Sequence, residues 1–372
     1  MIEPSEFVKC LSKTKIDFFT GVPDSLFKSL CIYLEKKQKK NNFITANEGS
    51  SVGLAIGYYL AKKKLPLIYL QNSGLGNAVN PLLSMANDKV YGIPLFLLIG
   101  WRGEFYKKKQ IKDEPQHRKQ GLVTEKLLKV LDIKYKILNK NTNLEKTIKD
   151  LAKYALEKNK PVGLLVRKNI FKNNLKKKIT SNYFTREDAL KAVVKNIPKN
   201  SIKISTTGML SRELNELNLI NNSTKNTFMC VGAMGHTISI ASGIAISKPN
   251  KKIFCFDGDG SFLMHLGAST TSANLKNIIH IVFNNRSHDS VGGHDTSAPD
   301  LNLKDIAIKL GYGICKIAKS EKQIKKVLKN QIKNKKNLFL EIICSRGNRK
   351  NLTRPGKPLK IYKQEFLKFI SK

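Results

Sequence analysis

Residues 251–294 read KKIFCFDGDGSFLMHLGASTTSANLKNIIHIVFNNRSHDSVGGH and decide the fold. A short apolar run at 253–256 leads into DGDG at 257–260, and a second apolar run at 278–283 leads into NN at 284–285. Two short apolar runs separated by about one helix predict neighbouring buried strands of a parallel sheet. Ligands bind at the carboxyl ends of such strands, where loops leave the sheet. The polar residues of this stretch are therefore candidates for a binding site.

Side chains at the two expected strand ends favour a metal-bound phosphate group. Asp259 and Asn285, with a nearby backbone carbonyl, would offer hard oxygen ligands, which suit Mg²⁺ or Ca²⁺ held together with the phosphate oxygens of a substrate. Gly258 and Gly260 leave room for a diphosphate to approach the backbone. An isolated GDG is explained equally well by a tight turn between a strand and a helix, so the paired asparagines carry the prediction.

The length and composition predict a globular protein of two domains. The chain has 372 residues, of which 41% are hydrophobic and 26% charged. No apolar run reaches the length of a membrane span, and the opening residues MIEPSEFVKC lack the pattern of a signal peptide. The six cysteines form no CxxC pair and lie mostly in apolar runs, which indicates buried thiols rather than disulfides. We therefore expect a cytoplasmic protein without a membrane partner.

The formal net charge of +39 raises the alternative of a nucleic-acid-binding protein, because basic surfaces bind phosphate backbones. The positive charge comes overwhelmingly from lysines that are scattered over expected helices and loops, as in KKKQ and NLKKKI. Charge runs of this kind without a base-reading motif are usually solvated surface. We therefore expect no nucleic-acid partner.

Strand and helix patterns alternate in two successive sets, which predicts two doubly wound α/β domains. The first set spans 1–172, and the second spans 186–372 and ends in a basic C-terminal tail. The stretch 173–185 is polar, rich in lysine and without periodicity, so we expect a linker there. Within the first domain, residues 113–117 are expected in a long polar loop before a helix at 124–131.

Glu48 stands where an expected strand at 43–46 meets a helix of small residues. An acidic residue in the first turn is favoured by the helix dipole, which explains Glu48 without any catalytic role. The small residues on both sides would instead place it in a narrow cleft, where a desolvated carboxyl group can hold a proton or share one with a ring nitrogen.

Gly74 and Gly76 suggest a dinucleotide fingerprint, but the third glycine is missing, so an NAD-dependent oxidoreductase is disfavoured.

The combination of GDG, the paired asparagines and Glu48 resembles the thiamine-diphosphate enzymes. The resemblance implies two doubly wound parallel-sheet domains, the first binding the pyrimidine and the second the diphosphate, with no middle domain. It implies Mg²⁺ on Asp259, Asn285 and the carbonyl of Ser287, and a cofactor that lies at the subunit interface of a homodimer or homotetramer. Glu48 would bond the aminopyrimidine ring and promote loss of the thiazolium proton. The cofactor-binding residues implied are Glu48, Asn72, Gly232, Met234, Gly258, Asp259, Gly260, Ser261 and Asn285.

A bulky apolar residue at Met234 would prop the cofactor into its bent shape, as the resemblance implies. A methionine just before a helix is also an ordinary core residue, and this alternative stays open.

A longer series of motifs is similar to one branch of that family, the phosphonopyruvate decarboxylases. The motifs, in order, are TGVPDS, ANEG, QNSGLGNAVNP, IGWRGE, DEPQH, TTGMLSRE, GAMGH, DGDGSFLMHLGA and NNRSHDSVGGH. The similarity implies decarboxylation of 3-phosphonopyruvate, an anionic 2-oxo acid, to 2-phosphonoacetaldehyde and CO₂ in phosphonate biosynthesis, such as that of 2-aminoethylphosphonate. The nearest alternative is a sulfopyruvate decarboxylase, with a sulfonate in place of the phosphonate. Arg286 and His294 stand where a small residue and an amide would be expected, and they bear on substrate detail.

A substrate with a carboxylate and a phosphonate needs cationic and polar contacts. The expected catalytic residues are Glu48, His117 and His288. The expected substrate-binding residues are Asp24, Arg118 and His236. His117 and Arg118 are expected to bind the dianionic end from a polar loop that closes over the site. Each of these side chains taken alone is also compatible with an ordinary surface or core position.

Overall fold

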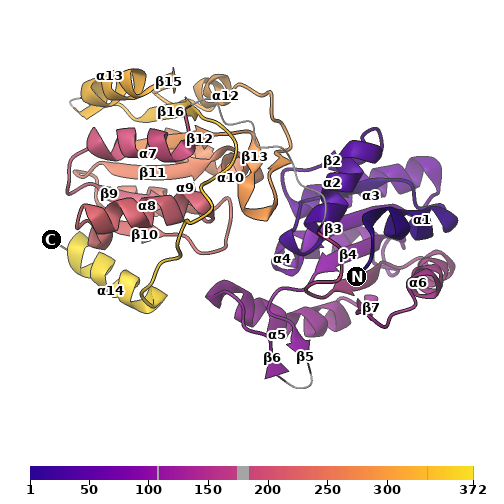
Figure 1. Ribbon diagram of the computed structural model, residues 1–372. Helices are drawn as coiled ribbons and strands as arrows, with labels where there is room; N and C mark the ends of the chain where they lie inside the picture. Colours follow the sequence, from indigo (N-terminus) through magenta and orange to yellow (C-terminus); the bar gives the residue numbers. More distant parts are fainter. Residues whose placement is uncertain (107–108, 174–183, 333, 372) are drawn as a thin grey trace. The chain divides into compact units, whose positions relative to one another are not determined.

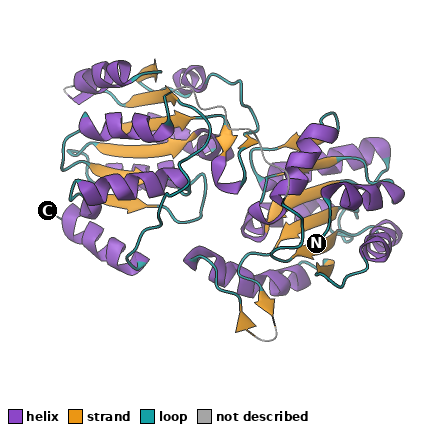
Figure 2. Ribbon diagram, viewed as in Figure 1, coloured by secondary structure: helices purple, strands orange, loops and turns teal. Residues whose placement is uncertain are grey.

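The chain folds into two compact units, Met1–Lys178 and Ile179–Lys372. The computed structural model describes residues 1–106, 109–173, 184–332 and 334–371. Each unit is a six-stranded sheet with helices packed on both faces (Figures 1 and 2). The prediction of two doubly wound α/β units is confirmed. Most of the linker expected at 173–185 lies outside the described residues, so its bounds stay a prediction.

The sheet of the first unit is parallel throughout, with the order β2-β1-β3-β4-β8-β7. Its strands are β1 (Phe19–Gly21), β2 (Asn42–Ile44), β3 (Leu67–Gln71), β4 (Phe96–Gly100), β7 (Lys134–Leu138) and β8 (Val162–Val166). Successive side chains of β3 enter opposite cores: Leu67 and Tyr69 face one, Ile68 and Leu70 the other. A strand buried on both faces must be apolar at every position, which explains the short uninterrupted apolar runs.

Three helices cover each face of this first sheet. The helices α1 (Pro4–Lys13), α2 (Lys28–Lys37) and α6 (Leu144–Lys158) share one core, and α3 (Glu48–Lys62), α4 (Leu75–Pro81) and α5 (Pro115–Val130) share the other. A short hairpin of β5 (Phe105–Tyr106) and β6 (Lys109–Gln110) precedes α5.

Helix α5 corrects one expectation from the sequence. The pattern predicts a loop through 113–117 and a helix at 124–131, but the helix begins at Pro115. Proline suits the first position of a helix, because its φ angle is preset and its missing N–H has no partner to lose there. His117 and Arg118 therefore lie in the first turn of a helix and not in a closing loop.

The sheet of the second unit is also parallel, with the order β10-β9-β11-β12-β16-β15. Its strands are β9 (Ile202–Ser205), β10 (Thr227–Met229), β11 (Ile253–Gly258), β12 (Ile278–Asn284), β15 (Ile314–Ala318) and β16 (Leu338–Ile343). One face is covered by α7 (Arg186–Lys195), α8 (Met209–Ile220) and α13 (Glu321–Ile332). The other is covered by α9 (Thr237–Ser247), α10 (Asp259–Met264), α11 (Ser269–Ala273) and α12 (Leu303–Lys309). Beyond β12, a small antiparallel ribbon joins β13 (Ser287–His288) to β14 (His294–Asp295).

The two sheets share one topology. Counted along the chain, the strands of each sheet lie in the order second, first, third, fourth, sixth, fifth. In such a sheet the winding direction changes between the first and third strands, and ligands bind outside their carboxyl ends. The loops after β1 and β3, and those after β9 and β11, are therefore the places where this fold supports a site.

The C-terminal segment, which the sequence predicts as a basic tail, ends in a helix. A further helix, α14 (Leu359–Ile370), packs its Phe366 ring against Phe228 of β10 at 5.7 Å between centroids. The arginines before it are paired: Arg346 with Asp295 at 2.6 Å, and Arg349 with Glu187 at 3.0 Å and with Glu216. These cations hold the segment to the second unit and are not available as a loose anion-binding tail.

All six cysteines are free thiols and five are buried, which confirms the expectation of thiols without disulfides. Among the described residues, none of the helices combines the length and the apolar character needed to cross a membrane.

A glycine in α5 fixes the approach of this helix to the loop after β4. A Cβ atom at Gly121 would lie 1.8 Å from the carbonyl oxygen of Gly103, and the indole Nε1 of Trp101 donates to the Gly121 carbonyl at 3.1 Å. We predict that Gly121→Ala destabilises the first unit by about 1–3 kcal/mol despite the higher helix propensity of alanine. Fluorescence of Trp101, the sole tryptophan, during urea unfolding measures this directly. The control, Lys119→Ala on the exposed side of α5, should stay within about 0.5 kcal/mol of the parent, and an equal stability of both variants would contradict the packing argument.

Candidate functional site

The DGDG turn lies where β11 ends and α10 begins. Asp257 turns back and accepts the backbone N–H of Gly258 through Oδ1 at 2.9 Å, which fixes the turn. Asp259 is the first residue of α10 and only 4% exposed. Its carboxylate accepts the Thr296 hydroxyl at 3.3 Å, and burial raises the pKa of this carboxyl group to about 7. Among the described residues no basic side chain pairs with Asp259.

The paired asparagines lie beside this turn because β11 and β12 are in register. Gly258 pairs with Phe283, so Asn285 follows directly beyond the strand end. The ribbon β13–β14 then folds back over α10: a Cβ atom at Gly260 would lie only 2.6 Å from Cε1 of His288. The structure thus gathers Asp259, Asn285 and Ser287 at one corner of the sheet, together with His288. A carboxylate, an amide oxygen and a backbone carbonyl are ligands that suit Mg²⁺, so these residues fit the ion predicted here.

The turn 232–235 also reaches this corner. It follows β10, and Gly232, Ala233 and Gly235 all have positive φ angles of 71°, 44° and 86°. The Gly235 N–H donates to the hydroxyl of Ser261 at 3.1 Å, and Thr206 donates to the same hydroxyl at 3.0 Å. Ser261 therefore ties the loop after β9 and the turn after β10 to α10.

Met234 is half-exposed at the tip of this turn, next to the buried Gly235. An apolar side chain held at the tip of a strained turn is available to a ligand, unlike a core methionine. His236 is the residue just before α9 and is exposed, and its ring stacks on that of His265 with centroids 4.5 Å apart.

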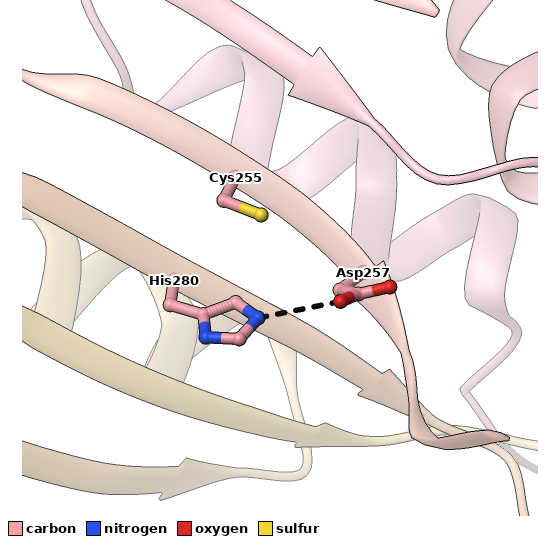
Figure 3. Close-up of side chains that lie close together, drawn as sticks. All are labelled: Cys255, Asp257 and His280. Carbon is pink, nitrogen blue, oxygen red and sulfur yellow. Dashed lines mark ion pairs between the residues drawn. The ribbon is translucent and has the colours of Figure 1, made fainter. Parts of the chain in front are cut away.

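A fully buried polar cluster includes the first residue of the DGDG turn. Cys255, Asp257 and His280 project from β11 and β12 on one face of the sheet (Figure 3). The Nε2 atom of His280 faces Asp257 Oδ2 at 3.6 Å, and its Nδ1 atom contacts the Tyr312 hydroxyl at 2.9 Å. Because the other oxygen of Asp257 holds the Gly258 N–H, we interpret the cluster as a brace beneath the turn. Nothing in the sequence pattern marks His280, which lies in the middle of an apolar strand.

Arg286 and His294, the two departures from the expected pattern, have different surroundings. Arg286 adopts a left-handed conformation with φ of 59°, which explains why a small residue is expected there. Its half-exposed side chain reaches toward Asp300 at 3.7 Å. His294 is fully buried in β14.

In the first unit, Glu48 lies at the start of α3, as the sequence predicts. Asn47 caps the helix by accepting the Ser50 N–H at 2.9 Å, which leaves the Glu48 side chain free for another role. Glu48 is 6% exposed, its Oε2 accepts the Asn77 amide at 2.7 Å, and burial raises its pKa. A Cβ atom at Gly74 would lie 2.1 Å from Oε1. Gly74 and Asn77 thus form the slot that holds the carboxylate, a role that their sequence, read as a broken dinucleotide fingerprint, does not reveal.

Asn72 is buried and its amide is fully engaged. Its nitrogen donates to the Arg102 carbonyl and to the Thr124 hydroxyl, both at 2.9 Å, and its oxygen accepts the Arg102 N–H at 3.2 Å. It therefore ties together the loops after β3 and β4, and its predicted contact with a cofactor stays a prediction.

Asp24, Arg102 and His117 gather near the carboxyl end of β4. Asp24 is fully buried against Gly100, and burial raises its pKa to about 6. Its Oδ1 caps a short helical turn through the Leu26 N–H at 2.7 Å, while Oδ2 has no hydrogen-bond partner within the described part of the chain. The guanidinium of Arg102 is held by Asp113, with Nε to Oδ2 at 2.8 Å, and by the Ser25 hydroxyl at 3.1 Å. A cavity of about 250 Å³ adjoins Ser25 and Arg102.

His117 is buried, and Arg118 is exposed. Burial and the charge of Arg102 lower the pKa of His117 to about 4, and none of the described residues hydrogen-bonds its Nδ1. The imidazole is therefore neutral at pH 7. This corrects the expectation that His117 offers a positive charge to a dianion: it can only donate or accept a neutral hydrogen bond.

Comparison with known proteins agrees with this geometry. Residues 5–123 match the family model described as thiamine pyrophosphate enzyme, N-terminal TPP binding domain, and residues 206–342 match the C-terminal TPP binding domain. A phosphonopyruvate decarboxylase from Streptomyces viridochromogenes is 29% identical over 84% of this chain and 81% of its own length. A sulfopyruvate decarboxylase from Methanosarcina acetivorans is 25% identical over 87% of this chain and 85% of its own length.

Shorter relatives cover part of the chain at higher identity. The alpha subunit of sulfopyruvate decarboxylase from Methanococcus maripaludis is 32% identical over 42% of this chain and 90% of its own length. The two sheets of one topology agree with the two matched domains, one in each unit. The chain therefore belongs to the thiamine pyrophosphate enzymes and is a decarboxylase of that family.

Proposed function

We propose that this decarboxylase acts on 3-phosphonopyruvate, with thiamine diphosphate and Mg²⁺, in phosphonate biosynthesis in the cytoplasm. The observation that carries the proposal is the gathering of Asp259, Asn285 and Ser287 beside a glycine-rich turn, in a chain similar to a phosphonopyruvate decarboxylase over 84% of its length. The overall reaction breaks the bond between the carboxylate and the keto carbon, CO₂ leaves, and a proton takes its place to give 2-phosphonoacetaldehyde. Thiamine diphosphate, when bound, supplies the electron sink for this cleavage.

The second unit would hold the diphosphate through the metal. Asp259, the oxygen of Asn285 and the carbonyl of Ser287 would bind Mg²⁺, and the buried, unpaired carboxylate of Asp259 favours a cation. Gly258 and Gly260 allow close approach to the backbone, and Gly232 and Met234 would face the cofactor from the adjacent turn.

The first unit would control protons at the pyrimidine. Glu48 is buried with a raised pKa, and one of its two oxygens is already held by Asn77. The remaining oxygen, Oε1, would then share a proton with a ring nitrogen of the cofactor, because a desolvated carboxyl group binds a proton more readily than an exposed one. A side chain at position 74 would collide with this oxygen, so Gly74 leaves room for it.

The anionic substrate would contact polar groups of both units. In the first, the unpaired Oδ2 of Asp24 and the neutral His117 are suited to hydrogen bonds with the carboxylate and keto group, and Arg118 supplies an exposed positive charge for the phosphonate. In the second, His288 beside Gly260 and the exposed His236 are the candidates. General acid–base assistance from such groups typically contributes about 10²–10⁴ in rate.

Sulfopyruvate is the second candidate substrate. The observation in its favour is that subunits named for sulfopyruvate decarboxylase are 30–34% identical to parts of this chain, whereas the phosphonopyruvate decarboxylase is 29% identical over 84% of it. Steady-state assays with phosphonopyruvate, sulfopyruvate and pyruvate, with and without thiamine diphosphate and Mg²⁺, distinguish the candidates. A preference for sulfopyruvate would overturn the substrate assignment and leave the cofactor assignment intact.

Removal of the metal-binding carboxylate tests the cofactor site. We predict that Asp259→Ala weakens Mg²⁺-dependent binding of thiamine diphosphate by roughly 100-fold, because the ion loses its anionic ligand. Isothermal titration calorimetry measures the affinity. Asp305→Ala, which removes an exposed carboxylate of α12 in the same unit, should leave it unchanged. Equal affinities of the Asp259 variant and the parent would refute the metal assignment.

Glu48→Gln tests proton control at the pyrimidine. The amide keeps the size of the side chain and a hydrogen bond to Asn77, but it cannot share a proton as a carboxyl group does. Turnover should fall by roughly 10² or more while cofactor binding survives in large part. Glu157→Gln on the exposed face of α6 is the control. Turnover within a few-fold of the parent would reduce Glu48 to a helix-start residue.

The same two variants test the proposed assembly, in which Glu48 of one copy and Asp259 of another complete each site. If copies exchange within a two-fold symmetric dimer, mixing inactive Glu48→Gln with inactive Asp259→Ala should restore about a quarter of the parent activity. No recovery after demonstrated subunit exchange would place both residues of a site in one copy.

The proposed substrate predicts different effects of substitutions at His117 and at Arg118. Loss of a charge-assisted contact costs about 1.5–3 kcal/mol, so Arg118→Gln should lower kcat/KM for phosphonopyruvate roughly ten- to a hundredfold and leave residual activity on pyruvate unchanged. His117→Ala should lower both activities alike, because the imidazole is neutral. Lys119→Gln, the exposed neighbour, is the control. A selective loss with His117→Ala would show that this histidine binds the phosphonate after all.

A further inference from the structure

A buried arginine lies behind the proposed metal site. Arg186 is the first residue of α7 and 7% exposed. Its Nε and Nη2 atoms donate to the two oxygens of Glu213 at 2.9 and 2.8 Å, and its Nη1 atom donates to Asp289 Oδ2 at 2.7 Å. The side chains of Glu213 and Asp289 are 1% and 5% exposed. One guanidinium therefore holds two buried carboxylates in a fixed arrangement.

Asp289 connects Arg186 to Asn285 by hydrogen bonds. The same Oδ2 atom that binds Arg186 accepts the Asn285 Nδ2 group at 2.6 Å. The N–H of Gly347 donates to both Asp289 oxygens, at 3.2 and 3.1 Å, so the carboxylate is held from a third direction. On the other side of the amide, Asn285 Oδ1 accepts the Ser287 N–H at 3.2 Å. The side-chain nitrogen of Asn285 thus faces Asp289, and its side-chain oxygen faces the backbone of Ser287.

This orientation matters for a cation. An asparagine amide can turn over and present its NH₂ group in place of its oxygen, and an NH₂ group does not bind Mg²⁺. Mg²⁺ also demands nearly octahedral oxygen ligands at about 2.0–2.1 Å, so a poorly placed ligand loses much of its value. Groups that hydrogen-bond a metal ligand from behind commonly change metal affinity by about 10–100-fold when altered.

We propose that Arg186 and Asp289 are positioning residues for the metal site, which hold the Asn285 amide with its oxygen available to Mg²⁺; this rests on the proposed function. Arg186 acts through Asp289 and touches neither the ion nor the substrate. A purely structural buried ion pair would stabilise the fold without changing the concentration of Mg²⁺ that the protein needs. The two roles therefore differ in a measurable way.

Arg186→Lys is the sharpest variant. Lysine keeps the positive charge but lacks the planar fork, so it cannot hold Glu213 and Asp289 together in the same geometry. Calorimetry of thiamine diphosphate binding at a series of Mg²⁺ concentrations should show a half-saturating Mg²⁺ concentration about tenfold higher than in the parent. At saturating Mg²⁺, both cofactor affinity and kcat should return to within about twofold of the parent values.

A matched control lies in the first unit, where Arg167 donates through Nε to the buried Glu104 at 2.8 Å. Arg167→Lys makes the same chemical change in a comparable buried pair far along the chain from Asn285. It should lower the unfolding temperature to a similar extent while leaving the Mg²⁺ requirement unchanged. An increased Mg²⁺ requirement in both variants would mean that general loss of stability is responsible, and would overturn the proposal.

Asp289→Asn is the second variant and serves if Arg186→Lys does not fold. It preserves the volume of the side chain but replaces an acceptor oxygen with an NH₂ group, so it weakens the hold on Asn285 Nδ2 and on Arg186. The same tenfold increase in the Mg²⁺ requirement is expected. An unchanged requirement in a folded Asp289→Asn protein would overturn the proposal.

The parent protein distinguishes failure of this proposal from failure of the proposed function. If the parent shows no Mg²⁺-dependent binding of thiamine diphosphate, the proposed function is wrong. If the parent binds the cofactor in this way and the variants match it, only the positioning role is wrong.

Discussion

The buried carboxylate of Asp259 is the constraint on which the second unit depends. Moving an anion out of water is costly unless the protein or a cation compensates it. Among the described residues, a hydroxyl and nearby backbone N–H groups are the compensation that Asp259 receives. Because this compensation is incomplete, burial raises the pKa of Asp259. The DGDG turn, its brace of Asp257 and His280, and the ribbon after β12 hold the carboxylate in place nonetheless. Such a rigid anionic position at a strand end is suited to binding a cation.

The parallel sheets supply the rigidity. Because β11 and β12 are in register and buried on both faces, their ends cannot shift without disturbing two cores. The same topology in the first unit places Glu48 at a comparable strand–helix junction. The second unit therefore carries the oxygens proposed to bind the metal, and the first carries the buried carboxyl group of Glu48, proposed to share a proton.

The basic charge divides between two uses. The lysines are mostly exposed, which agrees with a solvated surface. Several of the few arginines are committed to carboxylates instead: Arg102 to Asp113, Arg167 to Glu104, and Arg186 to Glu213 and Asp289. The planar guanidinium suits such partly or fully buried pairs, because it binds both oxygens of a carboxylate and is weakly hydrated. The net charge thus says little about the ligand, whereas the position of each arginine says much about the fold.

The sequence alone determined the two doubly wound sheets, the strand ends at Asp259 and Asn285, and the helix start at Glu48. Those features depend on local signals, namely apolar runs of strand length, glycines at turns and a cap before a helix. Only the tertiary structure decided that His117 is helical and neutral, that Gly74 and Asn77 enclose Glu48, and that Arg186 reaches Asn285 through Asp289. The physical reason is distance along the chain: Arg186 contacts Glu213 and Asp289, which lie 27 and 103 residues away, and burial or pairing at that range leaves no periodic trace in the sequence.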